Sequence, residues 1–234
     1  MFFKIKMDQN NIYKSLYKKN IQYIKSNNIT IDNNLLNLNN DRRLGLSIIL
    51  RPGYEFKPFY NSLLSDFKNI DPEQYYYPFE DLHITVFEFI PAYTDFQIDD
   101  FELNKYISIF KNIFKDEMPF IIDFSGIVFV KTAGIIKGYD KNRLFNIREK
   151  IRINLKKNNI KVKERYKSKT AHMTFCRFIN NISNLDLFIQ FIEKTQDYIF
   201  KREIINSIDM VIHDWYNISR KCRLIKRISF REEL

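Results

Sequence analysis

Two short stretches of the sequence, DLHITVFEF at residues 81–89 and TAHMTFCRF at residues 170–178, follow the same design. Each places a histidine, one apolar residue and a threonine inside an apolar run, which predicts a β-strand. The chain has only three histidines and seven threonines in 234 residues, so chance rarely produces two such tripeptides in matching contexts. We therefore treat His83 with Thr85, and His172 with Thr174, as a duplicated motif.

The spacing within each motif predicts a shared direction for its two polar side chains. Side chains alternate along a strand, so the threonine projects from the same face as the histidine two places before it. Imidazole exchanges a proton near neutral pH, and a hydroxyl can donate a hydrogen bond to a phosphate oxygen. Two facing pairs would supply a base, an acid and two phosphate anchors, which suits phosphodiester cleavage without a metal or another cofactor. The alternative is a pair of buried structural histidines.

Hydrophobic periodicity predicts a similar succession of elements around both motifs: helix, histidine strand, helix, two strands. The strands are expected at 43–50, 81–89, 119–130, 133–139, 170–178, 203–216 and 221–231, with the last two forming a hairpin. The helices are expected at 9–27, 56–70, 99–115, within the basic run that starts at residue 141, and at 184–200. Such near-duplication predicts two similar lobes packed about a shared cleft.

The N-terminal part has no counterpart in this repeat. Apolar spacing predicts a helix over 9–27, and the Asn-rich stretch 28–42 predicts a linker or irregular cover. We therefore expect an N-terminal helical extension with its linker at residues 1–42, and one compact domain at residues 43–234.

Composition narrows the class of protein. Apolar residues make up 45% and aromatic residues 16%, which excludes global disorder. No apolar run is long enough to span a membrane, and the first residues lack the apolar core of a signal peptide. Two cysteines, Cys176 and Cys222, do not make a disulfide framework. We expect a cytoplasmic protein with reduced thiols that is a monomer.

The net charge of +10 equals the excess within one segment, since residues 141–169 hold twelve Lys or Arg and two Glu. A focused basic region attracts phosphates or nucleic acid, although a solvated helix face has the same composition. We expect Arg143, Lys150 and Lys157 to face solvent. The stretch before His172 is expected to approach the rim of the cleft through Lys161, Lys163, Arg165, Lys167 and Lys169.

Both motifs, the opening strand RLGLSIIL at 43–50 and the duplicated layout resemble the two-histidine phosphoesterase superfamily. That superfamily includes bacterial RNA 2′,5′-ligase-like and eukaryotic cyclic phosphodiesterases and enzymes that degrade 2′,5′-oligoadenylate. The resemblance implies an α+β, bilobal fold with pseudo-symmetric antiparallel sheets, a central cleft and outer helices. It also implies metal-independent hydrolysis, with His83, Thr85, His172 and Thr174 as the catalytic set.

Three residues are weaker candidates. Arg177 comes five places after His172 and would face away from it in a regular strand. A bulge, or a place at the rim of the cleft, would bring Arg177 to a substrate phosphate. The resemblance favours this role, because many members of the superfamily have a basic residue here. Cys176 shares the His172 face of a regular strand and would lie at the cleft floor, most simply as an inert buried thiol. His213 beside Asp214 offers too few ligands for a metal site.

Several aromatic residues are candidates for stacking on a nucleobase, although core packing is the usual role of such side chains. They are Tyr77 before the first motif, Tyr139 at the end of a predicted strand, and Trp215 near the C-terminus.

The sequence thus predicts a phosphodiesterase that hydrolyses 2′,3′-cyclic phosphates or 2′,5′-linked, including cyclic, oligonucleotides. The substrate would carry a 2′-oxygen at the reacting phosphate. Two alternatives stay open: a nucleotide- or RNA-binding module that uses the same cleft without turnover, and an interaction protein that docks a partner through helix 9–27. Because the halves are near-equivalent, the sequence does not assign acid and base between His83 and His172.

Overall fold

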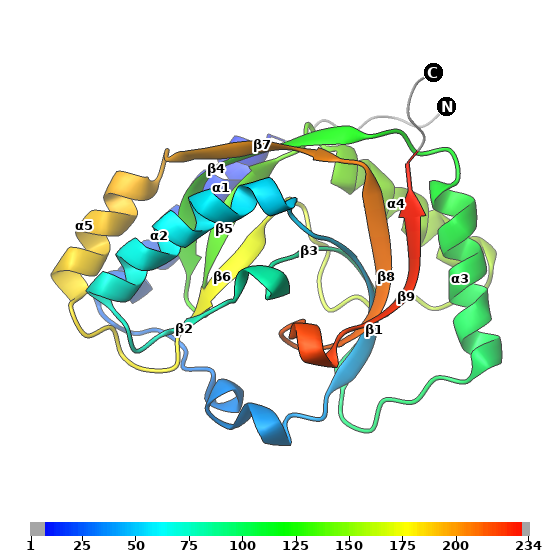
Figure 1. Ribbon diagram of the computed structural model, residues 1–234, viewed down its shortest axis with the longest axis horizontal. Helices are drawn as coiled ribbons and strands as arrows, with labels where there is room; N and C mark the ends of the chain where they lie inside the picture. Colours follow the sequence, from blue (N-terminus) through cyan, green and yellow to red (C-terminus); the bar gives the residue numbers. More distant parts are fainter. Residues whose placement is uncertain (1–7, 231–234) are drawn as a thin grey trace.

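The computed structural model describes residues 8–230, in which two antiparallel sheets lie side by side with helices outside them (Figure 1). The four-stranded sheet has the order β3-β1-β8-β9, and the five-stranded sheet has the order β2-β6-β5-β4-β7. The strands are β1 (Leu44–Leu50), β2 (Tyr75–Tyr76), β3 (Ile84–Tyr93), β4 (Phe120–Val130), β5 (Ala133–Tyr139), β6 (Met173–Arg177), β7 (Ile199–Ile205), β8 (Ser207–Asp214) and β9 (Arg223–Ser229). The predicted α+β architecture with two antiparallel sheets is confirmed.

The helices are α1 (Gln9–Lys25), α2 (Lys57–Ile70), α3 (Asp100–Phe114), α4 (Arg143–Lys157) and α5 (Leu185–Thr195). Single 3-10 turns or short 3-10 helices occur at η1 (Asn33–Asn40), η2 (Tyr54–Phe56), η3 (Phe79–Asp81) and η4 (Ser219–Lys221). The five predicted helices are therefore present, and α5 ends at Thr195 rather than near residue 200.

The duplication is visible in the strand order. The chain runs β1–α2–β2–β3 in one half, where the two-residue β2 pairs with β6, and β5–α4–β6 in the other. Each histidine strand pairs with the strand that precedes its helix. Next to the paired strands β3 and β1, strands β8 and β9 complete the four-stranded sheet. Next to β6 and β5, strands β4 and β7 extend the five-stranded sheet in the same way. Both histidines lie one residue before their strands begin, at the start of β3 and β6 rather than in the middle.

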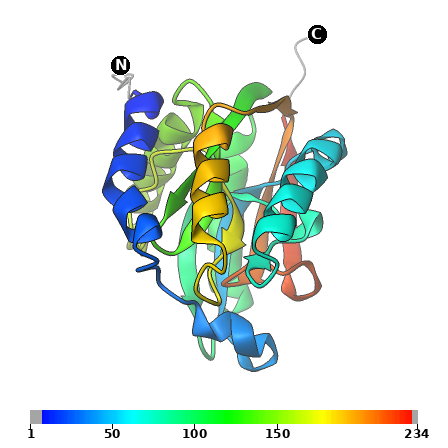
Figure 2. The ribbon, with the colours of Figure 1, turned by 90° about the vertical axis from the view of Figure 1, so that its left-hand side faces the viewer.

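The helices of the two halves are exchanged between the sheets. Helix α2, which follows β1 of the four-stranded sheet and precedes β2 of the five-stranded sheet, packs beside α5 and β7. Helix α4, which connects two strands of the five-stranded sheet, packs against α3 and β3. Figure 2 shows α1, α5 and α2 together on the face of the molecule formed around the five-stranded sheet. The lobes therefore share helices, and their apolar cores are continuous.

Aromatic side chains fill the junction between α2 and the five-stranded sheet. Phe67 of α2 is fully buried, and its ring lies 5.5 Å from Phe129, 5.2 Å from Phe175 and 5.6 Å from Phe188 between centroids. Large buried rings contribute both apolar area and favourable ring-to-ring contacts, so this cluster fixes α2 and α5 over the sheet.

Helix α1 lies against β4, with Tyr13 as its buried anchor. The Tyr13 hydroxyl donates to the carbonyl of Gly138 at 3.0 Å, and Gln9 Nε2 donates to the Asp140 carboxylate at 2.5 Å. From α1 the chain continues beside the sheets, where the amide of Asp32 donates to the carbonyl of Phe178 at 2.8 Å. The division of the chain at residue 43 stays a prediction.

The hairpin predicted over 203–216 and 221–231 is only partly correct. Its first stretch belongs to two sheets, since β7 ends at Ile205 beside β4, and β8 begins at Ser207 between β1 and β9. Asn206 is exposed at this junction. Continuous apolar patterning does not reveal such a crossing, because it reports burial and not the partner strands, which differ between β7 and β8.

Candidate active site

A cleft of about 540 Å³ lies between the lobes and contains all four residues of the duplicated motif, His83, Thr85, His172 and Thr174. Histidine strands β3 and β6 come together there, one from each sheet (Figure 1). The volume is in the range of about 300–1,000 Å³ that small-molecule sites occupy. The remaining lining comes mainly from residues 30–34, from the loop before His172, and from the end of β8.

Each histidine strand carries a β-bulge at the same place. In β3 the register against β1 shifts at Val86, and in β6 the register against β5 shifts at Phe175. Both residues come three places after the histidine. The burial pattern from the histidine onward is consequently the same in both strands, with the second and fifth residues after it partly exposed and the third and fourth buried.

The bulge decides the positions of Cys176 and Arg177. An extra residue re-aims the side chains that follow it, and Arg177 enters the cleft while Cys176 turns into the core with no exposed surface. The expectation that Cys176 shares the His172 face is therefore wrong. The equivalent of Arg177 in the first half is Glu88, which also lines the cleft. Aligning the two motifs in sequence by their histidines would have identified Glu88 as the counterpart of Arg177.

His83 is anchored by the main chain. Its Nδ1 lies 2.9 Å from the carbonyl oxygen of Asp81, which can only accept, so Nδ1 carries the hydrogen and Nε2 is left for a ligand. Burial, followed by the charge of His213, lowers the pKa of His83 to about 3. The imidazole is therefore neutral at pH 7.

His172 is anchored by a side chain instead. Its Nδ1 lies 2.8 Å from Oγ1 of Thr170, a hydroxyl that can donate or accept. Burial and then the charge of Arg148 lower the pKa of His172 to about 4. Gly138 of β5 allows the segment before β6 to come close, because a Cβ at Gly138 would lie 1.9 Å from the carbonyl oxygen of Ala171.

His213 is a third imidazole at the cleft that the sequence did not place there. Its ring lies edge-on to that of His83, and its Nδ1 donates to the carbonyl of Asp214 at 2.6 Å. Its Nε2 is buried without a hydrogen-bond partner in the part of the chain that the structure describes. Burial lowers its pKa to about 4. The only signal for His213 in the sequence is that it is one of just three histidines in the chain.

Trp215 lies at the cleft, but guanidinium groups contact its ring. Arg165 is centred 3.9 Å and Arg43 4.6 Å from the indole centroid. The Arg165 guanidinium is held by the carboxylate of Glu88, with Nε 3.1 Å from one oxygen. Any nucleobase that stacks on Trp215 has to share or displace these cationic contacts. Tyr166 is an exposed ring at the same cleft, with 64% of its surface free.

The other two aromatic candidates have different positions. Tyr77 lines the cleft but is only 1% exposed, and its hydroxyl accepts a hydrogen bond from Nε of Arg177 at 2.9 Å. Tyr139 is absent from the described residues that line the cleft, because its ring packs edge-on against Tyr13 of α1 at 5.3 Å. The structure therefore gives Tyr77 an orienting contact to Arg177 and places Tyr139 at the α1 packing surface.

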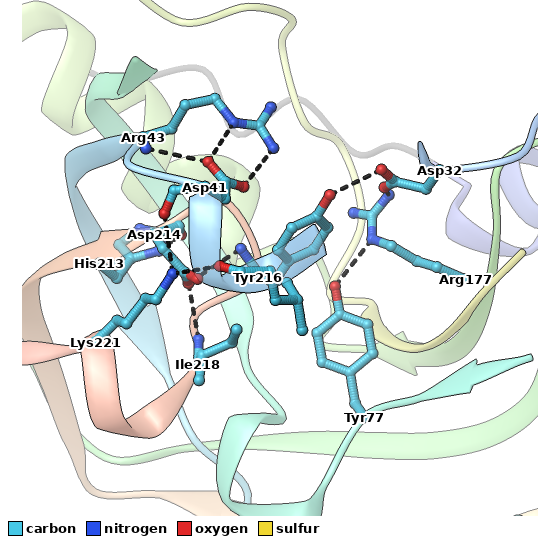
Figure 3. A network of polar contacts seen from close by, with 11 residues as sticks. Asp32, Asp41, Arg43, Tyr77, Arg177, His213, Asp214, Tyr216, Ile218 and Lys221 are labelled. Carbon is cyan, nitrogen blue, oxygen red and sulfur yellow. Dashed lines mark hydrogen bonds and ion pairs between the residues drawn. The ribbon is translucent and has the colours of Figure 1, made fainter. Parts of the chain in front are cut away.

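A polar network crosses the cleft from one lobe to the other through Asp32 (Figure 3). Its carboxylate accepts a hydrogen bond from the Tyr216 hydroxyl at 2.8 Å and lies 3.7 Å from the Arg177 guanidinium. Tyr216 follows β8 in the four-stranded sheet, whereas Arg177 ends β6 in the five-stranded sheet. Residues 30–34 thus form one wall of the cleft. Nothing in the Asn-rich sequence around Asp32 indicated this position.

The basic run divides into two parts. Within α4, the predicted apolar face is buried, and Arg148 and Arg152 are buried as well. Lys157 is exposed, whereas Arg143 and Lys150 are partly exposed and both bind the Glu117 carboxylate. In the following loop, Arg165 reaches the cleft together with Glu164, Tyr166 and Ser168. The four lysines of this loop (161, 163, 167 and 169) are exposed and do not line the cleft.

Residues 8–230 contain no cluster of three or more His, Cys, Asp or Glu side chains arranged to hold a metal ion. Within the same range, no helix combines the length and apolar character needed to cross a membrane.

Comparison with solved structures identifies the fold. TT0787 of Thermus thermophilus is similar with a TM-score of 0.57 at 14% identity, over 82% of this chain and 100% of that one. Apo LigT of E. coli gives 0.54 at 10% identity, over 80% and 98%, and LigT with 3′-AMP gives 0.51 at 8% identity over the same shares. A structure described as a phosphoesterase gives 0.52 at 10% identity, over 81% and 98%. The LigT-like fold expected from the duplicated motif is thereby confirmed.

No family model matches the chain, and no curated protein matches it.

Proposed function

We propose that this chain is a two-histidine phosphodiesterase that hydrolyses a phosphodiester whose reacting phosphate carries a ribose 2′-oxygen. The observation that carries the proposal is the meeting of both motifs in one cleft, with His83, Thr85, His172 and Thr174 contributed by equivalent positions of two sheets. The LigT-like fold supports a phosphoesterase-type enzyme. Each histidine is held through Nδ1, which leaves Nε2 to exchange a proton.

In the proposed mechanism one imidazole takes a proton from the attacking water as its oxygen bonds to phosphorus. The other imidazole, protonated beforehand, gives its proton to the ribose oxygen that leaves phosphorus. The proton count is balanced, since the first histidine ends protonated and the second ends neutral. Thr85 and Thr174 donate to the non-bridging phosphate oxygens, where negative charge accumulates.

Arg177 is proposed to stabilise the same negative charge. It lies in the cleft on the strand that carries His172, and the Tyr77 hydroxyl fixes its Nε. Charge-assisted hydrogen bonds from a guanidinium to phosphate are shorter and stronger than neutral ones. The neighbouring Asp32 carboxylate would have to share Arg177 with the bound phosphate.

The cleft suits a nucleotide. It combines phosphate-binding hydroxyls with the aromatic and guanidinium surfaces of Tyr166, Trp215 and Arg165, on which a base can stack. LigT has been crystallised with 3′-AMP, NADP+ and ATP, all of which are nucleotides. We propose 2′,3′-cyclic phosphates or 2′,5′-linked, including cyclic, oligonucleotides as the substrate class.

The test is a panel of 2′,3′-cyclic, 2′,5′-linked and 3′,5′-linked substrates incubated with the protein and a chelator, with products identified by mass. Hydrolysis of the first two classes is expected, with loss of about 10²–10⁴-fold in His83→Ala and in His172→Ala. The double variant should lose less than the product of the single losses, because both groups act in one transition state. Turnover that survives in either single variant at the wild-type rate would contradict the two-histidine mechanism.

The second candidate function is nucleotide or RNA binding without turnover. It is favoured by the low pKa values of His83 and His172, about 3 and 4, which leave both imidazoles neutral in the free protein at pH 7. Saturable binding of a 2′,3′-cyclic nucleotide with no product after long incubation at every pH tested would support the binding module. Product formation that depends on both histidines would exclude it.

A further inference from the structure

Arg148 is a buried cation placed directly behind both motifs. It belongs to the basic run but is only 1% exposed. Its Nε donates to the carbonyl of Val86 at 2.9 Å, and its Nη2 donates to the carbonyls of Thr85 and Thr170 at 3.0 Å each. One guanidinium therefore binds the bulge of the first histidine strand and the residue two places before the second histidine.

The bulge explains why carbonyl groups are free for Arg148. The extra residue of a bulge loses its place in the strand ladder, and in β3 that residue is Val86. Buried carbonyls without a partner are costly, so a donor from outside the sheet is needed. Helix α4 supplies it because the exchange of helices between the sheets places α4 against β3.

The arrangement is costly in another respect, since Arg148 forms no ion pair within the described residues. Its Nη1 is buried without a hydrogen-bond partner in the same range, and burial lowers the pKa of Arg148 to about 10. Removing a cation from water costs free energy, which offsets part of the stabilisation from its three bonds to carbonyls. What distinguishes arginine here is its geometry, since one planar guanidinium holds three carbonyls from two separate segments of the chain.

Thr170 connects Arg148 to the second histidine. Its carbonyl accepts from Arg148, and its hydroxyl lies 2.8 Å from Nδ1 of His172. The side chain is almost fully buried, with 5% of the residue exposed. The position two places before His83 is used differently, because Asp81 contacts its histidine through the main-chain carbonyl.

We propose that Arg148 and Thr170 are positioning residues that hold His172 and the Thr85 strand in a fixed relation across the cleft. The inference deepens the proposed phosphodiesterase function and rests on it. Arg148 fixes the main chain at Thr85 and at Thr170, and the Thr170 hydroxyl then fixes the His172 ring. Neither residue lines the cleft among the described residues, so neither is expected to touch substrate.

Thr170→Val tests the second contact, because valine keeps the shape and the carbonyl but removes the hydroxyl. A histidine displaced by about 1 Å can cost about 10²-fold in rate, so kcat should fall by about that factor with little change in KM. Thr170→Ser restores a hydroxyl and should recover most of kcat. The matched control is Thr195→Val, which removes another buried hydroxyl, hydrogen-bonded at 2.7 Å to Phe191 within α5.

Arg148→Lys tests the first contact, because one ammonium cannot reproduce the fixed guanidinium fork. Arg148→Lys should lower kcat and leave KM nearly unchanged. The control is Arg143→Lys on the same helix, where the side chain pairs with Glu117, and it should change neither constant. A folded Arg148→Lys protein with wild-type kcat would contradict the proposal. The wild-type protein gives a check without substitution: the Nε proton of Arg148 should exchange slowly with solvent, and fast exchange would also contradict it.

An NMR measurement separates this inference from the proposed function. The ¹⁵N shifts of the His172 imidazole report its Nδ1 contact whether or not the protein turns over any substrate. They should change in Thr170→Val, return toward wild type in Thr170→Ser and stay unchanged in Thr195→Val. Changed shifts in a protein that hydrolyses no substrate would overturn the phosphodiesterase function and keep the contact. Unchanged shifts and unchanged kcat in Thr170→Val would overturn the inference alone.

Discussion

The imidazoles of His83 and His213 lie edge to face, with ring centroids 6.2 Å apart, although 130 residues separate them in the chain. His213 lies on β8 opposite Gly45 of β1, and β1 pairs on its other side with the histidine strand β3. The candidate acid–base site therefore includes a neighbouring titratable ring that belongs to neither motif.

His213→Asn is expected to raise the pKa of His83. After burial, the charge of His213 is the next contribution that lowers this pKa. Asparagine keeps a side-chain donor for the Asp214 carbonyl and removes the second titrating ring. An NMR titration of the histidine Hε1 signals measures the change, with His172 as the internal control because burial and Arg148 set its pKa. An unaltered His83 titration would show that the two rings do not interact.

The pH dependence of kcat/KM should have its maximum on the acid side of neutrality. The proposed mechanism needs one protonated and one neutral histidine, and burial lowers the pKa of His83 to about 3 and that of His172 to about 4. As pH falls from 7 toward 5, the imidazolium fraction grows about tenfold per pH unit, and kcat/KM should rise with it. The sequence alone, with ordinary histidines, predicts an optimum near pH 6–7.5. Initial rates from pH 4 to 10, with folding checked by circular dichroism, decide between the two.

Thr85→Val and Thr174→Val should each weaken turnover by about ten- to a hundredfold. Each removes a hydroxyl that faces the cleft, and a hydrogen bond to a charged group contributes about 1.5–3 kcal/mol. Steady-state kinetics on the best substrate of the panel measures the loss, with Thr195→Val as the control for a buried hydroxyl. Wild-type kinetics in both variants would mean that neither hydroxyl contacts the phosphate.

Asp32→Asn should lower KM for the phosphodiester. The carboxylate lies 3.7 Å from the Arg177 guanidinium and offsets the charge offered to substrate. Asparagine keeps an oxygen that can accept from Tyr216. Exposed ion pairs contribute about 0.2–1 kcal/mol and this pair is largely buried, so KM should fall by about fivefold or more. Asp123→Asn, which breaks an exposed ion pair with Arg202, serves as the control. A rise in KM would indicate that Asp32 orients Arg177 rather than competing with substrate.

Charge reversal at Lys163, Lys167 and Lys169 should raise KM for oligonucleotides and leave a mononucleotide cyclic phosphate nearly unaffected. These lysines are exposed in the loop that brings Arg165 to the cleft. Wild-type binding of an oligonucleotide should weaken with salt by a logarithmic slope of about 0.7 per neutralised phosphate. Reversal of Lys14, Lys18 and Lys19 on α1 gives a control with the same change in net charge. Equal KM values in both triple variants would assign the loop lysines to a solvated surface.

Much of the fold follows from local patterning. The helices over residues 57–70 and 100–114 were predicted within one residue of their ends, because amphipathic spacing reports directly which side chains face the core. The two histidine strands and the shared cleft followed from the duplicated tripeptide, since strand alternation fixes the relation of His83 to Thr85 and of His172 to Thr174.

The tertiary structure decided what alternation does not encode. Bulges at Val86 and Phe175 brought Glu88 and Arg177 into the cleft and turned Cys176 into the core, because one extra residue reverses the faces that follow it. The sequence by itself identified the two motifs whose four polar residues meet in the cleft. Their surroundings, with Asp32, Arg148 and His213 as examples, came from segments far apart in the chain. Pairing between sheets and the exchange of helices depend on long-range packing, which no local pattern records.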